Sequence, residues 1–194
     1  MATQIFLLPG FHGSGSNHWQ TRWEEENQNY LRIVQDDWEN PVVRVWAQRV
    51  EDYLAQTNDE IVVVAHSLGC LTLAYWAQHT NLKINAALLV APPDINSPIL
   101  KQRVKGFDVL NPQPLPFKSI LLASSSDPYC SSSYSEQLAK SWGSHYVNLG
   151  DKGHLNAESM LGSWEEGKAH LDSLLETKKP ASNLISRGGS RLFI

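Results

Sequence analysis

The sequence is poor in cysteine. Its 194 residues include only two cysteines, Cys70 and Cys130. Two cysteines cannot build a disulfide framework, and no Cys/His spacing in the chain is typical of a zinc site. We therefore expect no bound metal, and we expect the protein to occupy a reducing compartment.

Charge and long apolar runs are also scarce. A net charge of −4 argues against a protein that binds the phosphates of nucleic acids. No apolar run approaches the about 20 residues that span a bilayer. The stretch MATQIFLLPGF at the start has neither the basic region nor the apolar length of a secretory signal. The sequence thus predicts a cytoplasmic protein with no nucleic-acid partner and no membrane partner.

Segments with the patterns of strands and helices alternate along the chain. Short apolar runs of the strand type occur at 4–8, 31–34, 61–65, 86–90, 119–123 and 146–149. Segments of the helical type occur at 17–26, 42–54, 68–80, 133–142 and 164–176. This alternation predicts an α/β fold in which about six mostly parallel strands form one sheet with helices on both faces.

Local signals predict where two of the helices begin. Asn17 is expected to cap the first helix, because asparagine side chains accept hydrogen bonds from the first helical N–H groups. Asn40 is expected to cap the second helix, with Pro41 at its first position, where proline is favoured. Both predictions rest on neighbouring residues alone.

The chain length fits a single domain with a substantial core. We expect this domain to cover residues 1–177. The proline-rich stretch 92–117 is too short for a second domain and is expected to wrap one end of the sheet. Residues 178–194 turn polar and contain glycine, so they are expected to form a C-terminal tail.

A serine lies at the end of the third predicted strand, in the stretch VVVAHSLGC. One interpretation is that Ser67 only caps the following helix. The other is a nucleophile elbow, whose pattern G-x-S-x-G is matched here with Ala65 in place of the first glycine and Gly69 as the second. A buried strand before the serine and an apolar helix after it are the context that this motif requires, and they favour the elbow.

A serine hydroxyl becomes a useful nucleophile only when a base removes its proton and an acid orients that base. In the fold that carries this motif, the chain order is serine, acid, histidine. Asp127 follows the fifth predicted strand and His154 follows the sixth. Asp94, after the fourth strand, is a rival for the acid, whereas Asp151 is expected to shape the histidine loop.

Two backbone N–H groups are expected to hold the oxyanion of an acyl-transfer reaction. The residue after the nucleophile, Leu68, supplies one, and Phe11 in the turn after the first strand supplies the other. His12 and His66 lie in turns at the carboxyl end of the sheet, so we expect them to line the pocket. His18 is expected on a helix surface.

The first loop contains several glycines, which raises the alternative of a nucleotide site. Its stretch LLPGFHGSG contains Gly10, Gly13 and Gly15. These glycines match neither G-x-x-x-x-G-K-[ST] nor G-x-G-x-x-G, and no lysine is present in the loop. The sequence therefore disfavours nucleotide binding.

Several stretches together resemble the small serine hydrolase family of retinoblastoma-binding protein nine and its bacterial YdeN-like relatives. They are LLPGFHGSGSNHWQTRWE, QDDWENPVVRVWAQRVEDYL, VVVAHSLGCLTLAYW, LLVAPPD, ASSSDPYC and GHLNAESMLGSWEEG. The resemblance implies a minimal, lidless, three-layer α/β-hydrolase with Ser67, Asp127 and His154 as its triad. Trp38 either lines the acyl pocket or packs beside Asn40 and Pro41.

The expected function is therefore that of a serine hydrolase. The enzyme would cleave a small or short-acyl ester through an acyl-enzyme intermediate, without a cofactor. Because the chain has no room for a large lid, we expect a shallow, accessible pocket for a small-molecule acyl substrate. Thioesterase or aminopeptidase action on the same triad, or a non-catalytic protein-binding role, are the alternatives, and the sequence identifies no protein partner.

Overall fold

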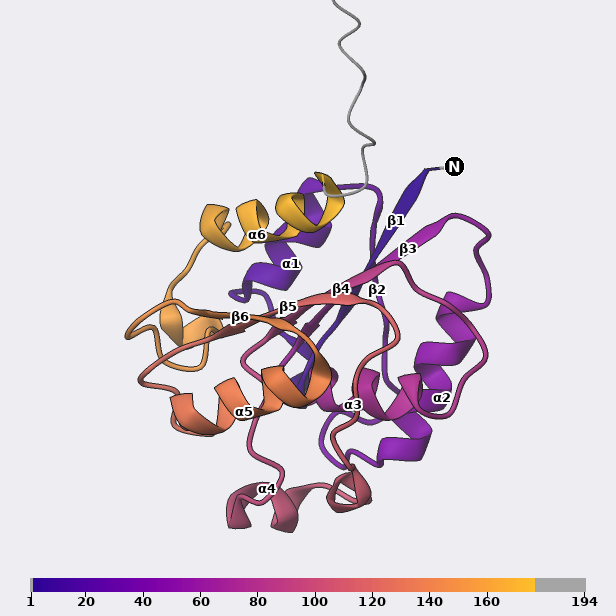
Figure 1. The fold of residues 1–194 in the computed structure, drawn as a ribbon. Coiled ribbons are helices and arrows are strands. Elements are labelled where there is room, and N and C mark those ends of the chain that lie inside the picture. The colour runs from indigo at the N-terminus through magenta and orange to yellow at the C-terminus, as the bar shows by residue number, and fades with distance from the viewer. Residues whose placement is uncertain (1, 177–194) are drawn as a thin grey trace, which may run out of the picture.

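The computed structural model of the chain describes residues 2–176 (Figure 1). The predicted tail at 178–194 lies outside the described residues. The strands are β1 (Thr3–Leu8), β2 (Tyr30–Arg32), β3 (Glu60–His66), β4 (Ala86–Val90), β5 (Lys118–Ala123) and β6 (His145–Asn148). They form one sheet in the order β2-β1-β3-β4-β5-β6, and every neighbouring pair is parallel. The predicted sheet is confirmed.

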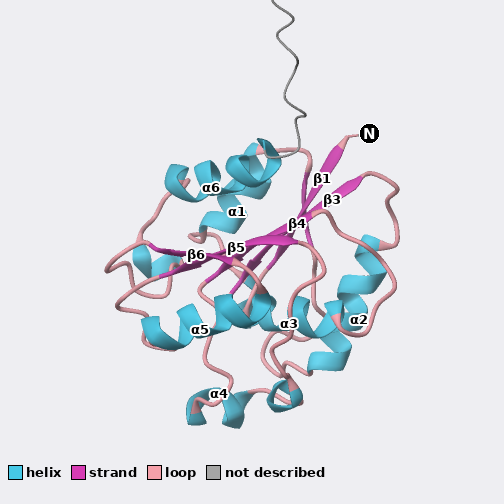
Figure 2. Cartoon of the chain, viewed as in Figure 1, coloured by secondary structure: helices cyan, strands magenta, loops and turns pink. Residues whose placement is uncertain are grey.

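Helices cover both faces of this sheet (Figure 2). The α-helices are α1 (Trp19–Glu26), α2 (Val43–Leu54), α3 (Leu68–Ala77), α4 (Pro98–Arg103), α5 (Ser132–Trp142) and α6 (Glu165–Glu176), and the short 3₁₀ turns are η1 (Phe11–Gly13), η2 (Phe107–Val109) and η3 (Ala157–Ser159). Helices α1 and α6 lie on one face, and α2, α3 and α5 lie on the other (Figure 1). The three-layer arrangement of an α/β-hydrolase is therefore present.

The strands are apolar on both sides because both faces are buried. In β3, Val62 and Val64 pack into the core under α1 and α6, whereas Val63 and Ala65 pack into the core under α2, α3 and α5. Successive side chains of a strand point to opposite faces, so a continuous apolar run serves two cores at once.

Helix α3 is apolar on all sides, and every residue from Leu68 to Trp76 is buried. A helix that is apolar on all sides must be buried by the rest of the protein, whereas a helix at the surface has a polar face toward solvent. Helix α2 shows that second pattern, since Val43, Trp46, Val50 and Leu54 are buried while the positions between them include exposed polar residues. α3 is thus the buried helix next to the sheet, and α2 covers it.

The predicted start of α1 was wrong by one residue. The helix begins at Trp19, and His18 rather than Asn17 is its N-cap. The Nδ1 atom of His18 accepts the N–H of Gln20 at 3.1 Å. The buried imidazole of His18 therefore makes the capping hydrogen bond that the sequence predicted for Asn17.

The predicted start of α2 was wrong as well. The helix begins at Val43, whose N–H donates to the carbonyl oxygen of Lys105 at 3.0 Å. Asn40 instead donates from Nδ2 to Asp37 Oδ2 at 3.0 Å. A contact between distant segments of the chain replaces the local cap.

The stretch 92–117, which was expected to wrap one end of the sheet, contains α4 and η2, and the sequence predicted neither. Phe107 and Leu110 are buried in the core under α3 and α5. In Figure 1, α4 lies beyond α3 and α5, away from the sheet. This segment is thus a folded part of the domain.

Both cysteines of the chain are free and buried. Burial raises the pKa of Cys70, inside α3, and raises that of Cys130 to about 11. Within residues 2–176, no helix has the length and apolar character needed to cross a membrane.

Gly69, the second residue of α3, provides a test of how closely that helix approaches β1. A Cβ atom at this position would lie 2.4 Å from Leu8 O and 2.8 Å from Pro9 O. Alanine normally stabilises a helix by about 1 kcal/mol relative to glycine. Here we expect Gly69→Ala to lower the free energy of unfolding by about 2 kcal/mol, because backbone atoms must move to admit the methyl group.

Urea denaturation followed by circular dichroism measures this difference. Gly15→Ala is the matched control, because a Cβ at Gly15 meets no atom within 4 Å, and we expect its stability to stay close to that of the parent. A Gly69→Ala protein as stable as the parent would contradict the close approach.

Candidate active site

Ser67 occupies a sharp, strained turn between β3 and α3. Its backbone has φ 52° and ψ −122°, a region that non-glycine residues rarely adopt. Its N–H donates to Val90 O at 2.8 Å, which ties the turn to β4. Its side chain makes no capping hydrogen bond to α3. The interpretation of Ser67 as a helix cap is therefore not supported.

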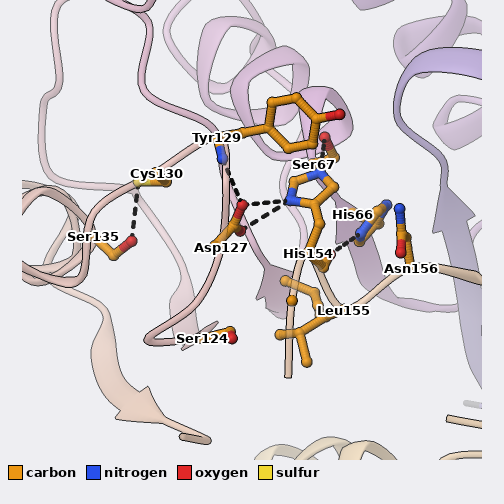
Figure 3. Close-up of polar contacts among 12 residues, drawn as sticks. His66, Ser67, Ser124, Asp127, Tyr129, Cys130, Ser135, His154, Leu155 and Asn156 are labelled. Atoms are coloured by element: carbon orange, nitrogen blue, oxygen red, sulfur yellow. Dashed lines mark hydrogen bonds and ion pairs between the residues drawn. The ribbon is translucent and has the colours of Figure 1, made fainter. Parts of the chain in front are cut away.

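Instead, the hydroxyl of Ser67 points at a histidine. The Oγ atom of Ser67 lies 2.8 Å from Nε2 of His154. On the other side of this ring, Nδ1 lies 3.0 Å and 2.9 Å from the two carboxylate oxygens of Asp127. Figure 3 shows the three side chains in line. Because the carboxylate accepts the Nδ1 proton, Nε2 of the neutral ring is left to accept a proton from the serine.

The carboxylate of Asp127 is shielded from solvent and fixed by the backbone. Its side chain is 3% exposed, and its Oδ1 accepts the N–H of Tyr129 at 2.9 Å. The rival acid, Asp94, accepts the N–H of Asn96 at 2.8 Å within its own turn, and Asp151 is exposed. Of the three candidate acids, Asp127 is the one placed against His154.

Two serines join the loop that carries Asp127 to the loop that carries His154. Ser124 Oγ donates to Gly150 O at 3.0 Å and accepts the N–H of Lys152 at 2.9 Å. Ser126 Oγ accepts the N–H of Gly153 at 3.0 Å. The loops after β5 and β6 are therefore held together next to the imidazole–carboxylate pair. This role of the serines in the ASSSDP stretch was not predicted from the sequence.

The two residues expected to supply oxyanion donors lie beside Ser67. Phe11 and Leu68 both line the cavity at the serine. The turn that carries Phe11 lies against the start of α3, since a Cβ atom on Gly10 would be 2.7 Å from Ser67 Cβ and 3.1 Å from Leu68 N. A glycine at position 10 is what allows this contact.

A cavity of about 420 Å³ opens at the carboxyl ends of the strands, next to Ser67 and His154. Helix α4 contributes Leu100 and Arg103 to its lining, and Val104 follows them. The expectation of a shallow, lidless pocket is therefore corrected in part. No separate domain covers the site within residues 2–176, but α4, which the sequence did not predict, forms part of a wall of it.

The three residues predicted to bind substrate have different positions. His66 is buried and lines the cavity, with Nε2 3.1 Å from the carbonyl oxygen of His154. His12 lines it at an exposed position, where its Nδ1 lies 2.8 Å from Glu39 Oε1. Trp38 is not part of the lining; its ring packs at 5.5 Å from that of Trp46. For Trp38 the packing interpretation is the one that the structure supports.

Comparisons with known proteins identify the family of the chain. The family model described as "Serine hydrolase" matches residues 5–173. The chain belongs to this family of serine hydrolases. None of the curated proteins compared with the chain matches it.

Solved structures of other hydrolases resemble this serine hydrolase over nearly its whole length. A putative YdeN-like hydrolase from Pectobacterium atrosepticum is 28% identical, with 92% of this chain and 93% of that chain covered and a TM-score of 0.82. The ydeN gene product from B. subtilis is 19% identical, with 90% and 100% covered and a TM-score of 0.78. Mouse alpha/beta hydrolase domain-containing protein 10 is 16% identical, with 91% and 90% covered and a TM-score of 0.66.

Several residues of the cavity were not predicted from the sequence. His18 was expected on a surface, but it is 3% exposed and lines the cavity. Tyr129 and Asn156 also line it, and the Tyr129 ring lies 4.6 Å from that of His154. Each follows a member of the pair Asp127 and His154 by two residues, which is a signal that could have identified them.

Two of the buried histidines that line the cavity, His18 and His66, are held in the neutral form. Burial lowers the pKa of His18 to about 3, with a smaller effect of the Arg32 charge. Burial also places the pKa of His66 well below its usual 6.5. Among residues 2–176, no group of three or more His, Cys, Asp or Glu side chains converges where a metal ion could bind.

This burial predicts a loss of stability in acid. Both histidines have lower pKa values in the folded chain than the 6.5 of an unfolded one, so unfolding below pH 6.5 is accompanied by proton uptake. The free energy of unfolding therefore has its full value with respect to these two groups above pH 6.5. It decreases as the pH drops toward 3. Each histidine contributes a slope of up to about 1.4 kcal/mol per pH unit.

Urea midpoints at pH 7.5, 6.0 and 5.0 measure the effect. We expect His18→Asn, which keeps an acceptor for the helix cap, to flatten the dependence. The exposed His145→Asn is the control and should retain the slope of the parent. Equal slopes in the parent and in His18→Asn would contradict the prediction for His18.

Proposed function

We propose that this serine hydrolase cleaves small or short-acyl esters, with Ser67 as nucleophile, His154 as general base and Asp127 as the orienting acid. The observation that carries the proposal is the position of the His154 ring. Its Nε2 lies 2.8 Å from Ser67 Oγ, while its Nδ1 contacts both oxygens of Asp127. The three groups fit the roles of the serine hydrolase mechanism.

The reaction proceeds in two steps. His154 takes the proton of Ser67 as its Oγ attacks the ester carbonyl, and the N–H groups of Phe11 and Leu68 stabilise the oxyanion. His154 then gives its proton to the leaving alcohol as the acyl-enzyme forms. A water molecule, activated by the same histidine, releases the acid and restores Ser67. Asp127 stabilises the imidazolium that forms in each step.

The size and lining of the cavity support a compact substrate. A volume of about 420 Å³ lies at the lower end of the range for small-molecule sites. Leu100 and Val104 give it an apolar side that suits a short acyl chain. Thioesters and amides contain the same reacting carbonyl, and a panel of butyryl ester, thioester and amide substrates separates these activities.

The free cysteines fit a cytoplasmic location.

Replacing Ser67 tests the proposal directly. We expect Ser67→Ala to abolish covalent labelling by a fluorophosphonate probe and hydrolysis of p-nitrophenyl butyrate. Its melting temperature should stay within a few degrees of the parent value, because the hydroxyl makes no capping bond.

Ser97→Ala is the matched control, since Ser97 lines the same cavity, and it should retain labelling. If Ser67→Ala instead keeps its activity and loses about 1 kcal/mol of stability, the serine is a helix cap and the proposal is wrong.

The identity of the acid gives a second test. We expect Asp127→Asn to lower kcat by about 10⁴, because the amide favours the wrong tautomer of His154. Asp94→Asn should lower it less than tenfold. Steady-state kinetics on folded protein, checked by circular dichroism, measures both. A large loss in Asp94→Asn with little change in Asp127→Asn would assign the acid to Asp94.

A further inference from the structure

The cavity beside Ser67 has two chemically different walls. The apolar wall, which packs against the core on the α3 side of the sheet, is formed by Phe11, Leu68, Leu100 and Val104. The polar wall, on the α1 side, is formed by Ser14, His18, His66 and Asn156. The α3 side also includes Arg103 of α4, whose guanidinium lies 5.9 Å from the centroid of the Phe11 ring. A substrate bound at Ser67 therefore meets mostly carbon on one side and uncharged hydrogen-bonding groups on the other.

The position of the polar wall follows from the alternation of side chains in β3. Val62 and Val64 face the core under α1 and α6, so His66, two residues on, faces the same side. Its ring lies 4.7 Å from the ring of His18 and 6.0 Å from that of Trp19 in α1. The two histidines thus form one continuous surface.

His18 contains a buried donor that the protein leaves unused. Its Nδ1 accepts the N–H of Gln20, so the proton of the neutral ring is assigned to Nε2. Nε2 is buried and has no hydrogen-bond partner in the described part of the chain. A buried N–H group without a partner costs free energy, which an acceptor on a ligand recovers. His18 therefore favours a ligand oxygen at this wall.

His66 complements this donor with an acceptor. Its Nε2 donates to the carbonyl oxygen of His154 at 3.1 Å, which leaves Nδ1 without a proton. Because burial keeps the pKa values of His18 and His66 low, both rings are uncharged at neutral pH. The wall therefore offers hydrogen bonds without a charge, which suits hydroxyl groups better than carboxylates.

The polar wall lies where the leaving group must be. His154 has to reach the leaving oxygen to protonate it, and Asn156 of the polar wall belongs to the same loop. Figure 3 shows His66 and Asn156 on one side of His154 and Asp127 on the other. The proposed oxyanion donors, Phe11 and Leu68, belong to the apolar wall. The acyl chain is thereby assigned to the apolar wall and the leaving alcohol to the polar wall.

We infer that this hydrolase acts on short-chain acyl esters of small, uncharged polyols, and that His18 Nε2–H donates a hydrogen bond to a hydroxyl of the leaving group. This inference deepens the proposed function and rests on it. The ester C–O bond breaks as Ser67 Oγ bonds to the acyl carbon. The serine proton passes through His154 to the polyol oxygen, and water then releases the acid.

A pair of esters that differ only in hydroxyl groups tests the inference. Glycerol 1-butyrate and 2-methylbutyl butyrate have leaving groups of similar shape, with two hydroxyls in the first replaced by methyl groups in the second. We expect kcat/KM to favour the glycerol ester by about tenfold or more, because a site built for hydrogen bonds rejects an analogue without them. Titration of Ser67 with a fluorophosphonate counts the active molecules in each preparation.

Two variants of His18 separate its donor from its other contacts. His18→Phe keeps a ring without nitrogens, and His18→Asn keeps an acceptor for the cap of α1. Both should reduce the preference for the glycerol ester to within about threefold of unity. Leu100→Ala, in the apolar wall, is the matched control. It should shift the preferred acyl length while retaining the preference for glycerol.

A measurement on the parent enzyme keeps the test decisive if the variants fail to fold. Glycerol and 2-methylbutanol compete with water for the acyl-enzyme formed from p-nitrophenyl butyrate, and glycerol should capture about tenfold more of it at equal concentration.

Equal capture, or equal kcat/KM for the two esters in an enzyme that Ser67 labelling shows to be active, overturns the polyol inference and leaves the proposed function standing. Absence of both labelling and ester hydrolysis overturns the proposed function itself.

Discussion

The backbone of Ser67 keeps an unfavourable conformation because its surroundings leave it no alternative. A non-glycine residue at φ 52° costs about 1–3 kcal/mol. The turn is fixed by the N–H bond to Val90, by a glycine contact with the first loop at Gly10, and by burial of both flanking elements. Since β3 and α3 are anchored in two cores, the turn cannot relax without disturbing them. The hydroxyl is thereby held at the edge where the other strands end.

The imidazole of His154 is also held from several directions. Asp127 contacts its Nδ1, and the backbone of its loop is bound by His66 at the residue itself and by Trp19, whose Nε1 donates to Leu155 O at 2.8 Å. Serine hydroxyls of the neighbouring loop bind the preceding residues. These contacts come from α1, β3 and the loop after β5. A buried polar network of this kind specifies one arrangement when all its members are paired.

The sequence predicted the sheet and most helices because their patterns depend on burial, which repeats with a fixed period. It also predicted that Ser67, Asp127 and His154 lie together, as they do in the structure, because parallel strands bring their following loops to one edge. The predictions from the sequence were wrong where a single contact between distant segments decides where a helix begins or which way a side chain points. The carbonyl of Lys105 replaces the local cap of α2, and the ring of His18 turns inward at a position that precedes the helix. Such residues are not part of a periodic sequence pattern, and the short helix α4 has no periodic pattern either.

The residues that line the cavity come from several different connections of the sheet. The wall formed by α4 belongs to the connection between β4 and β5, whereas the serine, histidine and aspartate lie on three other connections. Insertions are tolerated in surface connections far better than in strands. A lineage can therefore lengthen or replace the segment around α4, and so change the lining of the cavity, while Ser67, Asp127 and His154 keep their positions.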